Sequence, residues 1–190
     1  MFQSRKKKKS TRRLNGKQFF KRCKSKQTRW WILHNKEIGG YDRSVYKRGG
    51  YKKIWCPFDT AESEFVKTFK ALGYEVVYGH IDTGQDFFDY TEPQGDIVVS
   101  NPPFSKRDAI FQRLYEMKVP FALIMNFNGL FDSKKRAEIF RHNEVELLVP
   151  KGRMRFIHKD KGALNAPNFQ SVYVCSGLLD KQITFSDCEF

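Results

Sequence analysis

The chain of 190 residues carries 35 Lys and Arg against 21 Asp and Glu, a formal net charge of +14. Hydrophobic residues make up 40% of it, with 18 Phe, which supports a folded core and excludes a fully disordered chain. The sequence has no apolar run of about 18 residues and no apolar signal-peptide core near residue 1, so it predicts no membrane association and a cytoplasmic location.

The positive charge is concentrated near the N-terminus. Residues 1–53 hold 19 Lys and Arg against 2 acids, whereas residues 54–190 hold 16 against 19. We therefore predict a basic, loop-rich N-terminal arm and entry segment over 1–53 and an α/β domain over 54–190. A cationic arm is typical of proteins that bind a polyanion, so DNA or RNA is the expected partner. The alternative is a solubilising tail or a non-specific RNA binder. The sequence does not indicate an oligomeric state.

The cysteine pattern favours neither disulfides nor zinc. The four cysteines lack CxxC spacing and have no histidine at zinc-ligand spacing. Two of them, Cys56 and Cys175, stand in apolar strand-like runs and are expected to be buried free thiols. No metal is predicted.

Strands and helices are expected to alternate from residue 54 onward. Strands are predicted over 54–56, 74–78, 96–100, 120–125 and 144–149, and helices over 60–72, 106–117 and 134–141. Asp59 is predicted to cap the first helix, with Glu62 as its capping-box partner, and Gly73 to end it. Residues 154–157, 170–175 and 183–185 predict short closing strands.

This order predicts an α/β Rossmann-like fold. Its sheet is expected to be mostly parallel, with helices on both faces and an antiparallel C-terminal finish.

Asn101-Pro102-Pro103-Phe104 is the most informative motif, because it follows the buried strand 96–100. The asparagine amide carries an acceptor and two donors. The two prolines fix their own φ angles and hold the preceding residues extended, and Phe104 offers a flat ring. These residue types suit a planar group that bears an exocyclic amine.

Two other strand ends are expected to lie at the same edge of the sheet. The helix that begins after residues 57–60 suits an anionic group, and Asp82, after the second strand, suits ribose hydroxyls. Together they predict a cofactor that contains a nucleoside, with its reactive end near Asn101.

The segment Asp96–Phe104 resembles motif IV of the amino-methyltransferases that use S-adenosylmethionine. Residues 53–179 are similar to small phage-type DNA adenine-N6 methyltransferases, on motifs that also include Trp55–Asp59, Gly79–Asp82 and Gly84–Phe87. The segments Asn126–Leu130 and Ala166–Phe169 add to the resemblance.

The resemblance implies a methyltransferase fold and transfer of a methyl group from S-adenosylmethionine to the N6 amine of adenine in DNA. Asn101 and the Pro102 carbonyl would accept hydrogen bonds from the amine, and Phe104 would stack on the base. The catalytic residues implied are Asn101, Pro102, Pro103 and Phe104. The cofactor-binding residues implied are Cys56, Pro57, Phe58, Asp59, Thr60, Asp82, Asp86 and Phe87.

Two departures from the family keep other functions open. Residues 56–63 contain no glycine where relatives have a glycine-rich turn, so the Thr60 and Ser63 hydroxyls are expected to hold the methionine moiety. Residues 29–33 lack the upstream Thr-Pro element. The alternatives are a catalytically impaired module that binds nucleic acid or inhibits a nucleoprotein machine, and an RNA base-amine methyltransferase. The basic arm argues against a protein substrate, although the tetrapeptide also resembles protein-glutamine methyltransferases.

Overall fold

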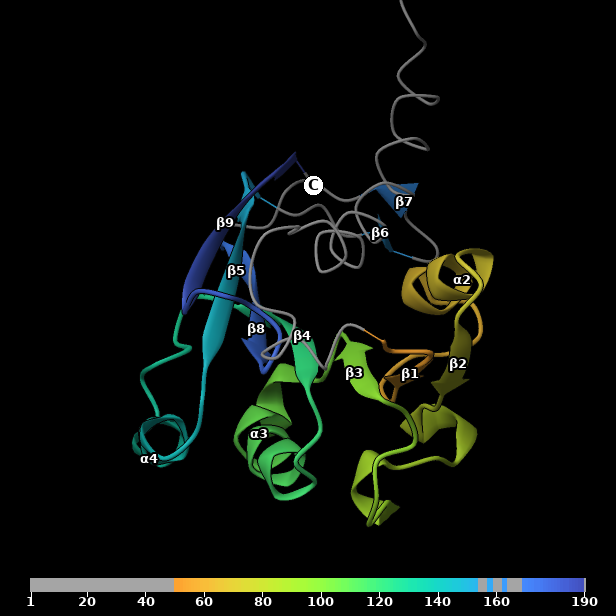
Figure 1. Cartoon of the computed structure of the whole chain (residues 1–190), viewed down its shortest axis with the longest axis horizontal. Helices are drawn as coiled ribbons and strands as arrows, with labels where there is room; N and C mark the ends of the chain where they lie inside the picture. The colour runs from red at the N-terminus through yellow and green to blue at the C-terminus, as the bar shows by residue number, and fades with distance from the viewer. Residues whose placement is uncertain (1–49, 154–156, 159–161, 164–168, 190) are drawn as a thin grey trace, which may run out of the picture.

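The computed structural model describes residues 50–153, 157–158, 162–163 and 169–189 (Figure 1). The predicted arm lies almost entirely outside the described residues, as do Trp30 to Leu33, so the division at residue 53 stays a prediction. No helix in the described ranges is long and apolar enough to cross a membrane.

One seven-stranded sheet forms the centre of the molecule, in the order β2-β1-β3-β4-β8-β5-β9. The strands β2, β1, β3 and β4 are parallel, and β8 lies antiparallel between β4 and β5. The edge strand β9 pairs parallel with β5. The strand bounds are Lys53–Cys56 (β1), Glu75–Tyr78 (β2), Ile97–Ser100 (β3), Phe121–Asn126 (β4), Glu146–Lys151 (β5), Ser171–Ser176 (β8) and Ile183–Glu189 (β9).

This arrangement confirms the predicted α/β class and its mostly parallel, Rossmann-like sheet. The antiparallel finish is present in β8, and a short antiparallel pair is formed by β6 (Ile157–His158) and β7 (Gly162–Ala163). The parallel pairing of β9 with β5 is an addition that the sequence did not predict.

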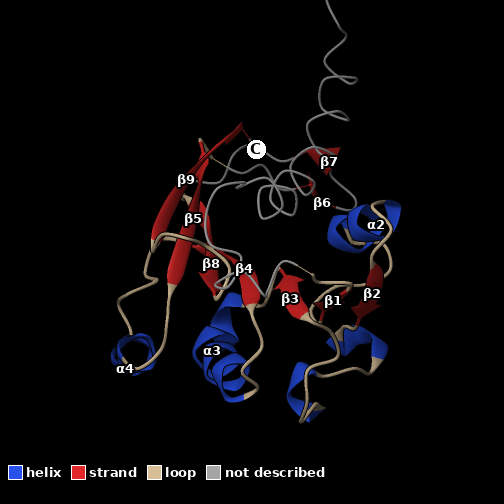
Figure 2. Ribbon diagram, in the orientation of Figure 1, coloured by secondary structure: helices blue, strands red, loops and turns tan. Residues whose placement is uncertain are grey.

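Helices cover both faces of the sheet, as expected (Figures 1 and 2). The helices are α2 (Glu64–Ala71) on one face and α3 (Arg107–Glu116) and α4 (Lys134–Arg141) on the other. Because successive side chains of a strand point to opposite faces, each strand contributes to two cores. Trp55 and Val98 pack in the core that contains α3, whereas Ile54 and Ile97 pack in the core that contains α2.

Burial explains why the central strands are short apolar runs. Every residue of β3 is buried, as are the first five of β4, because these parallel strands have neighbours on both sides and cores on both faces. Such strands need no alternation of polar and apolar residues.

The first helix begins later than predicted. It starts at Glu64, and Ser63, not Asp59, is its N-cap, with the Ser63 hydroxyl accepting the Phe65 N–H at 3.3 Å. The prediction for Asp59 was wrong because residues 57–63 form turns and its carboxylate is used elsewhere. The prediction for Gly73 is confirmed: its φ is +85°, and the N–H groups of Gly73 and Tyr74 bond back to the last helical turn.

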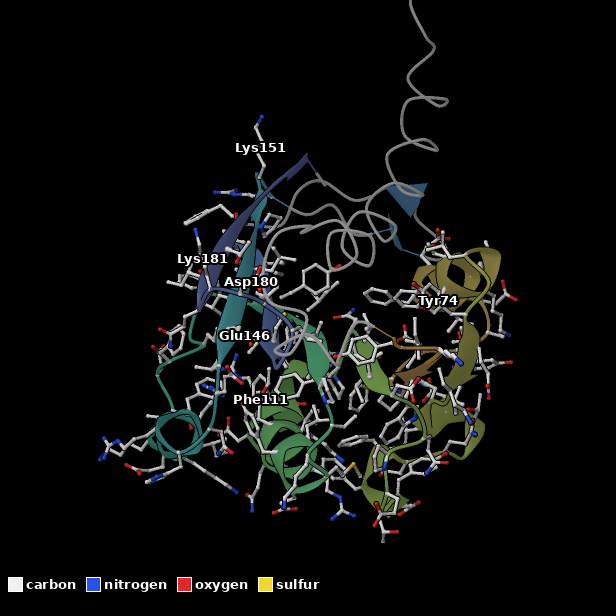
Figure 3. All side chains as sticks on the ribbon, viewed as in Figure 1. Tyr74, Phe111, Glu146, Lys151, Asp180 and Lys181 are labelled. Atoms are coloured by element: carbon white, nitrogen blue, oxygen red, sulfur yellow. The ribbon has the colours of Figure 1, made fainter. Side chains whose placement is uncertain are left out.

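A buried carboxylate fixes the turn that follows β8. Glu146, at the start of β5, is 3% exposed and accepts hydrogen bonds from the backbone N–H groups of Gly177, Leu178 and Leu179 (Figure 3). Burial raises the pKa of Glu146, and the backbone donors oppose that shift. The side chain therefore joins β5 to the exit of the antiparallel strand.

Glu146→Ala is expected to lower the free energy of unfolding by about 2–4 kcal/mol, because it leaves buried N–H groups without an acceptor. Urea denaturation measures the loss, with the exposed Glu144→Ala as the matched control. Equal stability of the two variants would contradict this role for Glu146.

Candidate active site at the carboxyl edge of the sheet

The order of the strands reverses between β1 and β3. From β1 the chain passes through α2 to β2 on one side, while β3 and β4 extend the sheet on the other. In open α/β sheets, ligands bind at such a switch point, outside the carboxyl ends of the strands. The turn that follows β1 and the Asn101–Phe104 turn that follows β3 are both located there.

Hydrogen bonds bring these two turns and the end of β2 together. The Phe58 N–H donates to the Ser100 hydroxyl at 3.2 Å, and the Asp59 N–H donates to the Gly79 carbonyl at 2.9 Å. The three strand ends that the sequence predicted to converge therefore do meet.

The carboxylate of Asp59 is the centre of this junction. Asp59 is 7% exposed, and the hydroxyls of Ser63 and Ser100 each donate to one of its oxygens. The backbone N–H of Asn101 also bonds to it. The side chain thus links the end of β1, the N-cap of α2 and the first residue of the Asn101–Phe104 turn.

Burial raises the pKa of Asp59, and this effect outweighs the hydrogen bonds from Ser100, Ser63 and Asn101. His80, beside it, also acts in the lowering direction. The two oxygens of Asp59 thus accept hydrogen bonds from three groups of the protein, those of Ser63, Ser100 and Asn101.

Within the turn, the four residues differ in exposure. Asn101 and Pro103 are exposed, Pro102 is buried and Phe104 is half-buried against the α3-side core. In the part of the chain that the structure describes, no hydrogen bond engages the Asn101 side chain or the Pro102 carbonyl. Their acceptor oxygens are available to a ligand.

The end of β2 presents an exposed acid. Asp82 lies in a short 3₁₀ turn, Ile81–Thr83, and its side chain is 82% exposed. The Asp82 N–H donates to the His80 ring at 3.1 Å, and Ile81 is 60% exposed beside it. An open carboxylate next to an open apolar side chain suits the ribose and base of a nucleoside.

The remaining predicted cofactor residues are more enclosed. Asp86 caps a second 3₁₀ turn, Phe87–Asp89, by accepting the Phe88 N–H at 3.0 Å, and Phe87 is buried. Pro57 is buried, whereas Phe58 and Thr60 are half-buried. The Phe58 and Phe87 rings pack against each other at a centroid distance of 4.9 Å, in the core that contains α3.

Cys56 is fully buried at the end of β1, and burial raises its thiol pKa. It is therefore a packing residue and not a reactive thiolate. No group of three or more potential metal-ligand side chains exists among the described residues.

Sequence reasoning missed the structural role of Ser100. Its position, a small polar residue that ends a buried apolar strand, is the only local signal for that role. Of the segment Ala166–Phe169, only Phe169 lies within the described residues.

Comparisons with known proteins add little. The sequence matches no protein-family model, and no curated protein matches it. The M protein of the type I restriction enzyme EcoKI shares 17% identity over 60% of this chain, with a TM-score of 0.34, and this chain spans 29% of its length. Precorrin-6y C5,15-methyltransferase from Geobacter metallireducens shares 12% identity over 78% of this chain and 86% of its own, with a TM-score of 0.40.

Matches with such low sequence identities and TM-scores do not support a conclusion about function. The fold and the site together define a Rossmann-like α/β domain with an open Asn-Pro-Pro-Phe turn at its switch point.

The raised pKa of Asp59 has a consequence for stability. The pKa of Asp59 in the folded protein lies above its ordinary value of 3.8. Such a carboxyl group contributes most to the free energy of unfolding at a pH below the ordinary value, where it is protonated. That contribution is lost as the pH rises through the folded-state pKa. Asp59→Asn stays neutral. The free energy of unfolding of the wild type, relative to this variant, is therefore expected to fall as the pH rises above about 4.

Urea denaturation over this pH range tests the expectation. The matched control is Asp82→Asn, which removes an exposed carboxylate after the neighbouring strand β2. A relative stability of the wild type that rises with pH would contradict the environment assigned to Asp59.

Proposed function

We propose that this protein is an S-adenosylmethionine-dependent methyltransferase that acts on the N6 amine of adenine in DNA. The observation that carries the proposal is the Asn101–Phe104 turn at the switch point, with the Asn101 amide exposed and both acceptor oxygens available. The resemblance of Asp96–Phe104 to motif IV supports the same chemistry.

The residues around the switch point fit the proposed cofactor by their chemistry. The open Asp82 carboxylate can accept the ribose hydroxyls, and Ile81 offers an apolar surface to the base. The half-buried Thr60 hydroxyl can hold the methionine moiety. When bound, S-adenosylmethionine supplies an electrophilic methyl group on a sulfonium.

Asn101 and Pro102 orient the nucleophile in this proposal. The Asn101 side-chain oxygen and the Pro102 carbonyl each accept one hydrogen bond from the adenine amine, which directs its lone pair toward the methyl group. The same oxygens stabilise the positive charge that develops on the nitrogen. Phe104 packs against the base, and catalysis comes mainly from positioning.

Asp59 contributes by holding the turn. Its bonds to the Ser100 hydroxyl and the Asn101 N–H fix the backbone from which the accepting oxygens project. A target adenine inside a duplex must first leave the stack, which costs a few kcal/mol.

Asn101→Ala is expected to lower the rate of methyl transfer by about a hundredfold or more, because it removes an acceptor that stabilises the transition state. The assay follows transfer of tritium from labelled S-adenosylmethionine to adenine-containing DNA, and mass spectrometry of the digested product identifies N6-methyladenine. The matched control is Asn143→Ala, exposed just after α4.

Transfer that survives Asn101→Ala would refute the assigned mechanism. Absence of transfer by the wild type would remove the proposed activity. A product found in RNA and not in DNA would move the assignment to an RNA base-amine methyltransferase.

The proposed partner of the basic arm is DNA. Residues 1–53 hold 19 Lys and Arg against 2 acids, a density of charge that suits phosphate contacts. Deletion of residues 1–28 is expected to weaken DNA binding and to flatten its salt dependence, because fewer counterions are released. Fluorescence anisotropy at several salt concentrations measures both, and an unchanged slope would assign the arm to another task.

A second candidate is a methyltransferase-like module that binds nucleic acid without catalysis. The observation that favours it is the turn after β1, where residues 56–63 contain no glycine and the Asp59 carboxylate is already bonded within the protein. DNA binding without any affinity for S-adenosylmethionine would support this candidate.

A further inference from the structure

Two phenylalanines are exposed on the loop that follows β4. Phe127 is 42% exposed and Phe131 is 51% exposed, and their ring centroids are 6.2 Å apart in an edge-to-face arrangement. Phe131 also packs on Phe140 at 6.0 Å, and Phe140 packs on the buried Phe111 at 5.1 Å. The exposed rings are therefore supported from the core.

The loop that carries these rings is held in one conformation. The Asn126 side chain accepts the Asn128 N–H at 2.8 Å, and the Leu130 N–H donates to the Phe127 carbonyl at 3.1 Å. Gly129 has a φ of +68°, which few other residues adopt. Its neighbour Leu130 is fully buried.

A buried guanidinium adds to this support. Arg136 of α4 is 2% exposed, donates to the Gly129 carbonyl at 2.9 Å and also bonds to the Leu130 carbonyl. Its charge is balanced by Asp108 of α3. The loop thus forms a preorganised platform, which lowers the entropy lost when a ligand binds.

The platform lies at the same edge of the sheet as Asn101. The β3 and β4 strands are parallel neighbours with Ser100 opposite Leu123, so Asn101 and the end of β4 point to one side. A Cβ on Gly129 would lie 3.3 Å from the Asp132 carboxylate and 3.6 Å from the guanidinium of Arg107, the first residue of α3. The loop therefore adjoins the segment that directly follows the Asn101–Phe104 turn.

Cations accompany the exposed rings. Lys134 and Lys135 are exposed at the start of α4, and none of the ion pairs in the described part of the chain includes Lys134, Lys135 or Arg107. Asp132 is the one acid on the loop itself. Aromatic faces next to cations are the combination that binds unpaired nucleotides, through base stacking and phosphate contacts.

We infer that Phe127 and Phe131 form a stacking platform for an unpaired nucleotide beside the target base. This inference rests on the proposed function for the identity of the partner, a polynucleotide. It assigns the recognition of bases near the site to the loop after β4. The Asn126–Leu130 part of this loop belongs to the methyltransferase resemblance, but the resemblance gave it no role. In this arrangement the basic arm binds the phosphates of the polynucleotide, and the platform stacks on its bases.

The test uses the full chain and fluorescence anisotropy with labelled oligodeoxyadenylate of about 20 nucleotides. The double variant Phe127→Ala/Phe131→Ala is expected to bind about tenfold more weakly, with an unchanged salt slope, because no charge is removed. An abasic oligonucleotide of the same length is expected to bind the variant and the wild type equally. The matched control, Phe185→Ala, removes a ring that is 76% exposed on the distant edge strand β9 and should have no effect.

The inference is overturned if Phe185→Ala and the double variant lose equal amounts of binding affinity, or if the double variant loses as much affinity for the abasic strand as for oligodeoxyadenylate. It is also overturned if sedimentation shows a dimer of the wild type that the double variant does not form. The last result would assign the rings to contact between two copies of the chain. Circular dichroism and thermal unfolding confirm that the variants are folded.

Failure of the inference and failure of the proposed function are separable. The binding assay contains no cofactor. Base-dependent binding through Phe127 and Phe131 without methyl transfer by the wild type would remove only the proposed activity. Methyl transfer by the wild type, together with oligonucleotide binding that the double variant retains in full, would remove only the platform.

Discussion

The arrangement of the site depends on one buried carboxylate. Asp59 follows β1, yet its backbone N–H bonds to Gly79 after β2, and its side chain bonds to Ser63 before α2 and to Ser100 at the end of β3. Burying a carboxylate lowers the stability of the fold unless its oxygens are hydrogen-bonded. The buried position of Asp59 therefore requires that all of these elements are in place. These hydrogen bonds connect the ends of β1, β2 and β3 to one another at the switch point.

This constraint divides the acids of the site into two roles. Asp59 faces inward and holds the protein together, whereas the side chain of Asp82 is 82% exposed and faces solvent. The sequence placed Asp82 at the ribose from its position after the second strand, and the methyltransferase resemblance implied a cofactor role for Asp59. Burial separates them: the Asp59 carboxylate is enclosed by its hydrogen-bond donors, whereas the Asp82 carboxylate is open to solvent and has His80 Nδ1 at 3.3 Å as its neighbour.

Much of the fold could be predicted from the sequence, because buried parallel strands leave a clear signal. The runs 54–56, 96–100 and 120–125 are apolar on both faces, and β1, β3 and β4 form there. Asn101 was predicted to lie at the strand end for the same reason. The start of α2 was wrong, because a capping box is a local pattern and Asp59 satisfies distant partners instead.

The platform after β4 could not be predicted in this way. It depends on Arg136, which reads in the sequence as an ordinary helix cation, and on Asp108, 28 residues away along the chain. Only the packed structure shows that the guanidinium is buried and that two phenylalanine rings stay exposed. Pairings at such separation leave no local periodicity.

Calorimetric titration of S-adenosylmethionine into the full chain tests most directly whether the switch point binds the proposed cofactor. The account predicts stoichiometric binding that Asn101→Ala retains and Asp82→Ala weakens about tenfold, since the lost carboxylate is a charged hydrogen-bond acceptor. The account would be contradicted if the wild type does not bind S-adenosylmethionine. It would also be contradicted if Asp82→Ala leaves the affinity unchanged and Asn101→Ala abolishes binding.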